Sequence, residues 1–376
     1  MLVTSLILVL VTGLLGIAGQ HRRNVQYQKQ QVQAYYIAEA GIERVMAQIR
    51  EDPSWLDRWK AGVEEEVSAV EGPYAGGQIS KVTLHKTTKD LGWEIEIVSQ
   101  GKFMGAQKTL KAKLQYTGPQ GIAGGLSLLP DAQGVLDIKG NFSLDSPVSA
   151  RARLLFNGDL VLSGSTDIKA DIYASGNVST QGSATKIEGQ VHSRVSDLPR
   201  FPDLDLSYYR AEAERQGRYY TGNREWEGKS LASGTYYVTG DLTLSGSYSG
   251  QITLVAEGEV EIQADSSYQG VTLISLGDVR LKGNGSLKGV IISRGSFVPG
   301  GSAEVEGAVV AKGLDLGGSG GSGGGSEHSG GGQGETGGGR GNVTLKYNPQ
   351  FVPGDALAGV LPQLRVLRWS ENFPVF

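Results

Sequence analysis

The chain has 376 residues, of which 57 are glycine, about twice the ordinary share. Proline is scarce, at 12 residues, and no Gly-X-Y period is present, which excludes collagen; a hydrophobic content of 39% excludes wholesale disorder. Because cysteine is absent, disulfide frameworks, thiolate metal sites and cysteine nucleophiles are excluded. The formal net charge of -4 argues against a protein that coats nucleic acid by bulk charge.

The first 20 residues form an apolar run without acidic or basic side chains, just long enough to cross a bilayer core of about 30 Å. Two other interpretations stay open. One is a buried core helix, although such a helix would ordinarily carry a polar face. The other is a cleaved secretory signal, for which residues 18–20 offer small side chains near a possible cut. Beyond this run, apolar residues continue as one helical stripe that ends before Pro53: Ala38, Ile42, Val45, Met46 and Ile49. We expect one helix over residues 1–50, transmembrane in its first part.

The sequence AYYIAEAGIE, which starts at Ala34, resembles the N-terminal region of PilX-type minor pilins of type IV pili. The resemblance covers about 50 residues and is most specific at Ala38, Glu39, Ala40, Gly41, Ile42 and Glu43. It implies a helix anchored once in the inner membrane, with the C-terminal part outside, that later packs against other pilins in a filament. Small residues such as Ala40 and Gly41 would let a neighbouring element approach closely.

Two departures from the family are present. The basic leader of a prepilin is missing, so either Met1 is a misplaced start or the chain is close to its mature form. The early glutamate of many major pilins is also missing, which favours a minor subunit.

Residues 51–118 and 346–376 predict the small antiparallel sheet of a pilin. Three segments alternate apolar and polar residues, at 79–85, 93–98 and 107–116, with turn residues between them. A fourth strand is expected at 364–369, almost at the C-terminus. The segment between these strands is therefore interpreted as an insertion.

The inserted residues 119–194 and 234–345 carry a glycine period of 18 to 19 residues. The marked glycines each follow or open a short apolar strand: Gly140, Gly158, Gly176, Gly240, Gly258, Gly277, Gly295 and Gly313. Such a period predicts a parallel β-solenoid, because a short strand buries its apolar face only when rungs stack. A β-sandwich is the alternative, and its turn spacing would drift more. The expected fold class is α+β, a pilin-like helix and sheet with an inserted solenoid.

Two segments interrupt the period. Residues 195–233 are interpreted as an excursion containing a short helix at 206–220. Residues 317–341, with 15 glycines among 25 residues, are interpreted as a flexible loop. This loop contains no Asp, which argues against a calcium site there.

The sequence motifs assign no catalytic, metal or cofactor-binding residue. The four histidines lack zinc-site spacing, and no phosphate loop or nucleophile elbow is present. Asp167, Asp171 and Glu188 are candidate carboxylates of a glycan-cleaving solenoid, but their positions in the period place them on different faces. We therefore expect a protein that is not an enzyme and needs no cofactor.

A candidate ligand or DNA patch lies in the excursion, where aromatic and basic residues interleave: Tyr208, Tyr209, Arg210, Arg215, Arg218, Tyr219, Tyr220 and Arg224. A solvated helix face with packed tyrosines is the simpler interpretation. Residues 120–350 hold 19 Lys and Arg against 25 Asp and Glu, which weighs against a basic DNA groove.

The expected function is a minor pilin-like subunit that primes a type IV pilus or related filament, or lies at its tip, and presents the solenoid head for adhesion at the cell surface. Its expected partners are other pilins, the inner membrane before assembly, and DNA or a surface ligand at the head. The alternative is a DNA-binding minor pilin for natural transformation, an arrangement similar to solenoid-bearing DNA-uptake minor pilins. A membrane-anchored β-helical glycan enzyme is a remote alternative.

Overall fold

The structure is a computed structural model that describes residues 2–316, 342–352, 354 and 357–371; the side chains of residues 2–11 and 120 are not described. The chain divides into two compact units. Unit 1 comprises Met1–Tyr116 and Pro362–Phe376, and unit 2 comprises Thr117–Leu361. Unit 1 is therefore built from both ends of the sequence. The division falls after residue 361, so residues 346–361, which were assigned to the small sheet, belong to unit 2.

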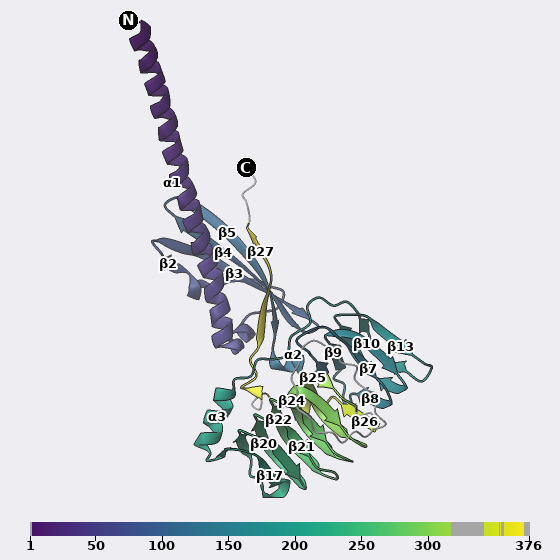
Figure 1. Ribbon diagram of the computed structural model, residues 1–376. Helices are drawn as coiled ribbons and strands as arrows, with labels where there is room; N and C mark the ends of the chain where they lie inside the picture. Colours follow the sequence, from purple (N-terminus) through teal and green to yellow (C-terminus); the bar gives the residue numbers. More distant parts are fainter. Residues whose placement is uncertain (1, 317–341, 353, 355–356, 372–376) are drawn as a thin grey trace. The chain divides into compact units, whose positions relative to one another are not determined.

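Unit 1 begins with α1 (Leu2–Glu51), a single helix of 50 residues that appears in purple in Figure 1. Nothing between its ends breaks a helix, and Pro53 follows its last turn. The predicted apolar stripe from Ala38 to Ile49 is buried, and Ala34 and Ile37 extend it by one turn. Before residue 34 the described side chains of α1 are mostly exposed.

No helix in the described part of the chain is both long enough and apolar enough to cross a membrane. The first half of the predicted transmembrane segment, residues 1–11, has no described side chains.

The sheet of unit 1 is antiparallel. Its strands are β1 (Glu64–Glu66), β2 (Gly72–Tyr74), β3 (Gly77–Lys89), β4 (Gly92–Phe103), β5 (Ala106–Thr117) and β27 (Gln363–Glu371). The order is β1-β3-β4-β5-β27, and β2 pairs with β3. The strand predicted near the C-terminus therefore does complete the sheet, beside β5. One 3-10 helix, Pro53–Arg58, lies between α1 and β1, and a second, Ser68–Val70, lies between β1 and β2.

The helix and sheet of unit 1 approach closely because small residues meet. A Cβ on Gly41 of α1 would overlap the hydroxyl of Ser99 on β4, and a Cβ on Gly101 would overlap the backbone of Ala34 and Ala38. The apolar core then fills with Ile42, Ile95 and Ile97 among others.

Unit 2 is a stack of short parallel strands in two blocks. The first block follows a short helix, α2 (Pro119–Ile122), and contains β6 (Gly125–Leu128), β7 (Gly134–Ile138), β8 (Asn141–Asp145), β9 (Ala152–Phe156), β10 (Gly158–Ser163), β11 (Ser165–Ile168), β12 (Ala170–Ala174), β13 (Val178–Gln181), β14 (Lys186–Ile187) and β15 (Val191–His192).

The second block contains β16 (Tyr219–Tyr220), β17 (Arg224–Glu227), β18 (Gly234–Val238), β19 (Leu242–Ser245), β20 (Ser247–Ala256), β21 (Val260–Ile262), β22 (Ser267–Ser275), β23 (Val279–Leu281), β24 (Ser286–Pro299), β25 (Glu304–Leu314) and β26 (Asn342–Lys346). Two 3-10 helices, Gly228–Ser230 and Pro349–Phe351, complete this region.

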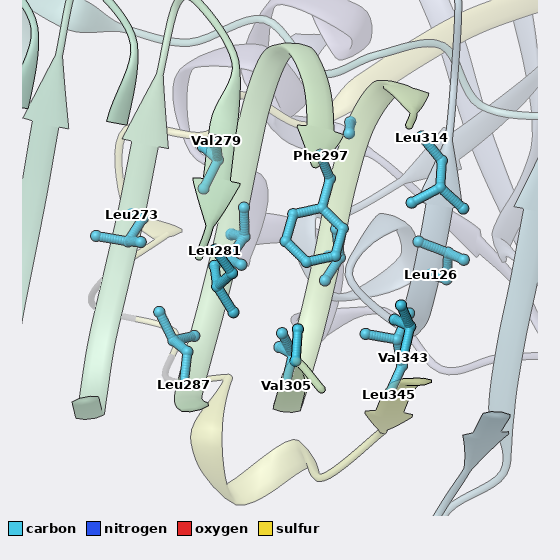
Figure 2. Packing of buried hydrophobic residues seen from close by; sticks show 14 of the residues in the cluster. Leu126, Leu273, Val279, Leu281, Leu287, Phe297, Val305, Leu314, Val343 and Leu345 are labelled. Carbon is cyan, nitrogen blue, oxygen red and sulfur yellow. The ribbon is translucent and has the colours of Figure 1, made fainter. Parts of the chain in front are cut away.

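The predicted rungs are present, and equivalent residues stack. Val279 lies opposite Phe297, which lies opposite Leu314, and Leu287 lies opposite Val305. Figure 2 shows these side chains as two neighbouring rows inside the stack. Because the strand pairs of unit 2 are parallel, the β-sandwich alternative is wrong for this unit.

The corner glycines leave room for a side chain that links successive rungs. The residue after such a glycine is often Asp, and its carboxylate accepts a backbone N–H from the next rung. Asp241 accepts from Glu259 N at 2.9 Å, and Asp278 accepts from Ser296 N at 2.8 Å. A Cβ on Gly258 or Gly295 would overlap this carboxylate. The glycine period is therefore a packing requirement of the corner.

The two blocks stack in the reverse of their sequence order. β6, at the start of the first block, pairs in parallel with β25, near the end of the second. Beside it, β8 pairs with β26. The stack therefore runs through the second block and continues through the first, so that β17 and β13 lie at its opposite ends (Figure 1).

The segment between the blocks is shorter than predicted. It contains α3 (Leu206–Arg215), and Asp205 caps this helix by accepting from Tyr208 N at 3.1 Å. The excursion predicted over 195–233 is wrong in its last part, because β16 and β17 already pair with β18 and β19 as a rung. The glycine-rich segment 317–341 lies outside the described residues.

Candidate functional site

The three carboxylates named as candidates for catalysis, Asp167, Asp171 and Glu188, lie on neighbouring rungs of the first block. Asp171 is buried and structural: it accepts from Gln190 N at 2.8 Å and pairs with Arg151 at 3.1 Å. Glu188 is exposed, and Glu188 and Asp167 both lie near Lys169. The hydrogen bond of Lys169 to Asp145, and the charges of Asp145, Asp167 and Glu188, raise the pKa of the lysine. Among the described residues, no group of three His, Asp or Glu side chains could hold a metal ion.

The pilin-like motif of α1 faces the chain's own sheet. Ala38, Gly41 and Ile42 are buried, Glu39 and Ala40 are half-buried, and Glu43 is exposed. The close approach that small residues permit is therefore used within unit 1, at Gly41 against Ser99.

A cluster of aromatic rings and arginines covers the β17 end of the solenoid. Tyr219 of β16 stacks on Tyr237 of β18, with ring centroids 5.7 Å apart. The guanidinium of Arg210, from α3, lies 4.8 Å from the Tyr219 ring. The short helix and the last rung are thus joined by cation–π and ring contacts.

Two more arginine–ring contacts belong to the same cluster. Arg218 lies 4.9 Å from the ring of Tyr236, and Arg224 lies 5.4 Å from that of Tyr220. Trp226 joins them, since its ring contacts those of Tyr220 and Tyr236 edge-on. We call these residues the terminal-rung cluster: Arg210, Arg218, Tyr219, Tyr220, Arg224, Trp226, Tyr236 and Tyr237.

Three residues of the predicted patch lie outside this cluster. Tyr209 is buried, and a Cβ on Gly359 would overlap its ring. Arg215 pairs with Glu212 on the surface of α3. Tyr208 is exposed and contacts the ring of Tyr209. The structure therefore brings together five of the eight predicted residues.

The charge of the cluster is mixed. Arg210 pairs with Glu214 at 2.9 Å, and this hydrogen bond raises the pKa of the guanidinium. The hydroxyl of Tyr237 donates to Glu257 at 2.7 Å; burial first, and this carboxylate second, raise the pKa of Tyr237. Tyr236 and Tyr237 are buried, and Tyr220 and Trp226 pack partly buried against the solenoid core. The surface of the cluster therefore consists of the half-buried rings of Tyr219, Tyr220 and Trp226 and the arginines beside them.

The sequence interpretation missed Trp226, Tyr236 and Tyr237. One signal was present: Tyr219 and Tyr237 are one 18-residue period apart, which places them opposite each other on neighbouring rungs. Treating Tyr219 as part of a helical excursion hid this relation.

No protein-family model matches the chain, and no curated protein matches it. Among solved structures, the chain is similar to the competence-associated pilin ComZ from Thermus thermophilus, at 14% sequence identity and a TM-score of 0.32, over 91% of this chain and 97% of that chain. A TM-score this low does not establish a shared fold.

Proposed function

We propose that the chain is a minor pilin-like subunit of a type IV pilus or related filament, with the β-solenoid as its head. The observation that carries the proposal is the division of α1. Its residues from Ala34 onward pack on the sheet of unit 1, whereas Leu14, Leu15 and Ile17 are each about two-thirds exposed. Exposed apolar side chains on a long helix favour burial against lipid or other helices.

The PilX-type assignment and the membrane anchor are parts of this proposal. They rest on the sequence: residues 1–20 contain no acidic or basic side chain, and the motif from Ala38 to Glu43 resembles that family. The subunit would be held in the inner membrane by this segment before assembly and reach the cell surface in the filament. Extraction of cell membranes with alkaline carbonate tests the anchor, since a spanning segment should keep the chain in the membrane fraction.

A place at the tip or in a priming complex fits the size of the head. Unit 2 has more residues than unit 1, and its insertion between β5 and β27 would obstruct close packing in the middle of a shaft. Labelling filaments with an antibody against unit 2 tests this place: signal at filament ends supports it, and signal along the shaft contradicts it.

Incorporation into filaments tests the role of α1. Leu15→Asp places a charge on the exposed apolar part of the helix and should remove the protein from sheared surface filaments. Val135→Asp, at an exposed apolar position in the solenoid, is the matched control and should be retained. Equal recovery of both variants in the filament fraction would contradict the proposal.

Adhesion through the head is the proposed use of the solenoid, and no catalytic step is included. The engagement of Asp171 with Gln190 and Arg151 supports a structural role for that carboxylate. Binding of the full chain to surfaces, compared with a chain lacking residues 120–345, tests adhesion. Cleavage of oligosaccharides by the full chain would instead support the glycan-enzyme alternative.

A second candidate function is binding of single-stranded DNA for uptake. The accessible part of the terminal-rung cluster favours it, because bases stack on aromatic rings such as the half-buried Tyr219 and Tyr220, and exposed arginines such as Arg224 pair with phosphates. Arg224→Ala should weaken binding of single-stranded DNA and reduce its dependence on salt, whereas Arg215→Ala, whose side chain pairs with Glu212, should change neither. Absence of salt-dependent binding by the full chain would exclude this candidate.

A further inference from the structure

The sheet of unit 1 has two different edges. In the strand order β1-β3-β4-β5-β27, β1 lies at one edge, where the short β2 also pairs with β3, and β27 lies at the other. An edge strand has backbone N–H and C=O groups on its outer side that its own sheet does not pair. The two edges of this sheet differ in length, polarity and charge.

The β27 edge is long and has exposed apolar side chains on both faces. Consecutive residues of a strand point to opposite faces, and the neighbours Val366 and Leu367 are both 37% exposed. Trp369 is also exposed. The strand is held to its sheet at one end by the pairing of Lys108 with Glu371. A nine-residue edge with exposed apolar side chains is the kind of edge to which another strand adds.

The charges of the two edges are opposite. β27 carries Arg365 and Arg368, both exposed, at its centre. β1 consists of three glutamates, of which Glu64 and Glu66 are exposed. The acidic edge of one copy is therefore complementary to the basic edge of another.

An antiparallel register would place a glutamate of β1 near each of these two arginines. If Glu66 of one copy lies directly opposite Arg365 of the next, Glu65 lies diagonally from Arg368, and Glu64 lies opposite Leu367. Direct and diagonal neighbours are about 5 Å and 7–8 Å apart, within reach of these long side chains.

We propose that copies of this chain associate head to tail, with β1 of one copy added to β27 of the next. Such an interface uses two different surfaces of the subunit and therefore extends along a filament or a priming complex. The inference rests on the proposed function, because that function brings copies together. In this arrangement the edges of the sheet form a second contact between copies, in addition to the contact made by α1.

Cysteine cross-linking of the purified full chain in detergent tests the proposal. The sequence contains no cysteine, so any introduced pair reports its own contact. The double variant Glu64→Cys with Leu367→Cys should give a series of dimers and larger multimers on a non-reducing gel after mild oxidation. A matched pair, Glu43→Cys with Leu367→Cys, has its first cysteine on an exposed position of α1 and should remain monomeric. Circular dichroism of each variant checks that it is folded.

Two results would overturn the proposal. Multimers that are no more abundant than in the Glu43→Cys control would exclude the contact. Strong dimerisation of the Leu367→Cys single variant would show that β27 pairs with itself instead. Cross-linking without recovery of the protein in filaments would count against the proposed function alone, and recovery in filaments without cross-linking would count against this inference alone.

Charge reversal tests the register. In a mixture of two variants, Glu64→Cys with Glu66→Lys on one chain should cross-link poorly to Leu367→Cys on the other. Adding Arg365→Glu to the second chain should restore the cross-link several-fold. Failure of this restoration, with both chains folded, would contradict the pairing of Glu66 with Arg365.

Discussion

Val309 of β25 lies opposite Leu126 of β6 in a parallel pair, although nearly half of the sequence separates them. This pair and its neighbours join the two solenoid blocks into one stack. The chain thus enters the stack at its middle, builds one end, crosses to the other end through residues 193–218, and builds back to the middle. At this junction each block ends in strands whose backbone groups are paired by strands of the other block, so each block depends on the other for that pairing.

Replacement of a glycine inside the stack should destabilise unit 2. Gly307 has a positive φ of 142°, and a Cβ there would overlap the carbonyl oxygen of Gly289 on the neighbouring rung. We expect Gly307→Ala to lower the free energy of unfolding by about 1–3 kcal/mol or more, the usual cost of overpacking. Gly134→Ala is the control, since nothing lies within 4 Å of a Cβ there. Urea unfolding of both variants measures the difference; equal stabilities would contradict the described rung spacing.

Substitution of Gly41 should show that α1 and β4 are in close contact. In a free helix, Gly→Ala stabilises by about 1 kcal/mol. At Gly41 we expect the opposite sign, because the added Cβ would overlap the buried hydroxyl of Ser99. Gly19→Ala, with open space around its Cβ, should not destabilise.

The combination of Gly41→Ala with Ser99→Ala should recover most of the lost stability, since it removes the overlapping oxygen. Thermal unfolding of the single and double variants gives the coupling between the two positions. Additive effects would mean that the residues do not touch.

Acid should weaken the solenoid at Glu306. Burial alone would raise the pKa of this carboxyl, but hydrogen bonds from Asn348, at 2.8 Å, and Lys288, at 2.9 Å, outweigh it and hold the pKa below its ordinary value. Between the folded and unfolded pKa values the unfolded chain binds more protons, so stability rises with pH there. The contribution is present above the ordinary value of 4.5 and is lost as the pH falls through the folded pKa.

The variant Glu306→Gln should therefore be less stable than the parent at neutral pH and lose less stability on acidification. Denaturant unfolding at a series of pH values measures both slopes. A parent and variant that lose stability in parallel below pH 4.5 would show that Glu306 makes no such contribution.

The rungs could be predicted from the sequence because their cause is local. Each corner needs a glycine, and each rung repeats its inward residues one period later, as with Val260 and Val279. The pairing of β6 with β25 could not be predicted in this way. Parallel edges with similar apolar patterns are nearly interchangeable, and their choice of partner depends on the whole chain.

The candidate site was only partly predictable for a related reason. Composition identified the aromatic and basic segment. This segment contains both α3 and the first rung of the second block, and composition does not show where the helix ends and the rung begins. Whether an arginine faces a ring, like Arg218, or a glutamate, like Arg215, depends on where the helix ends. The period reveals the stacking of Tyr219 on Tyr237 once β16 is recognised as a strand.

A cysteine pair across the junction tests the account most directly. Asn141 of β8 and Asn342 of β26 are exposed and lie opposite each other, with a side-chain hydrogen bond of 2.7 Å. The variant Asn141→Cys with Asn342→Cys should form an intramolecular disulfide in most molecules, detected by non-reducing peptide mapping. Asn141→Cys with Asn284→Cys, three rungs and about 14 Å apart in the stack, should form none. A disulfide in the control, or none in the junction pair, would contradict the single continuous solenoid.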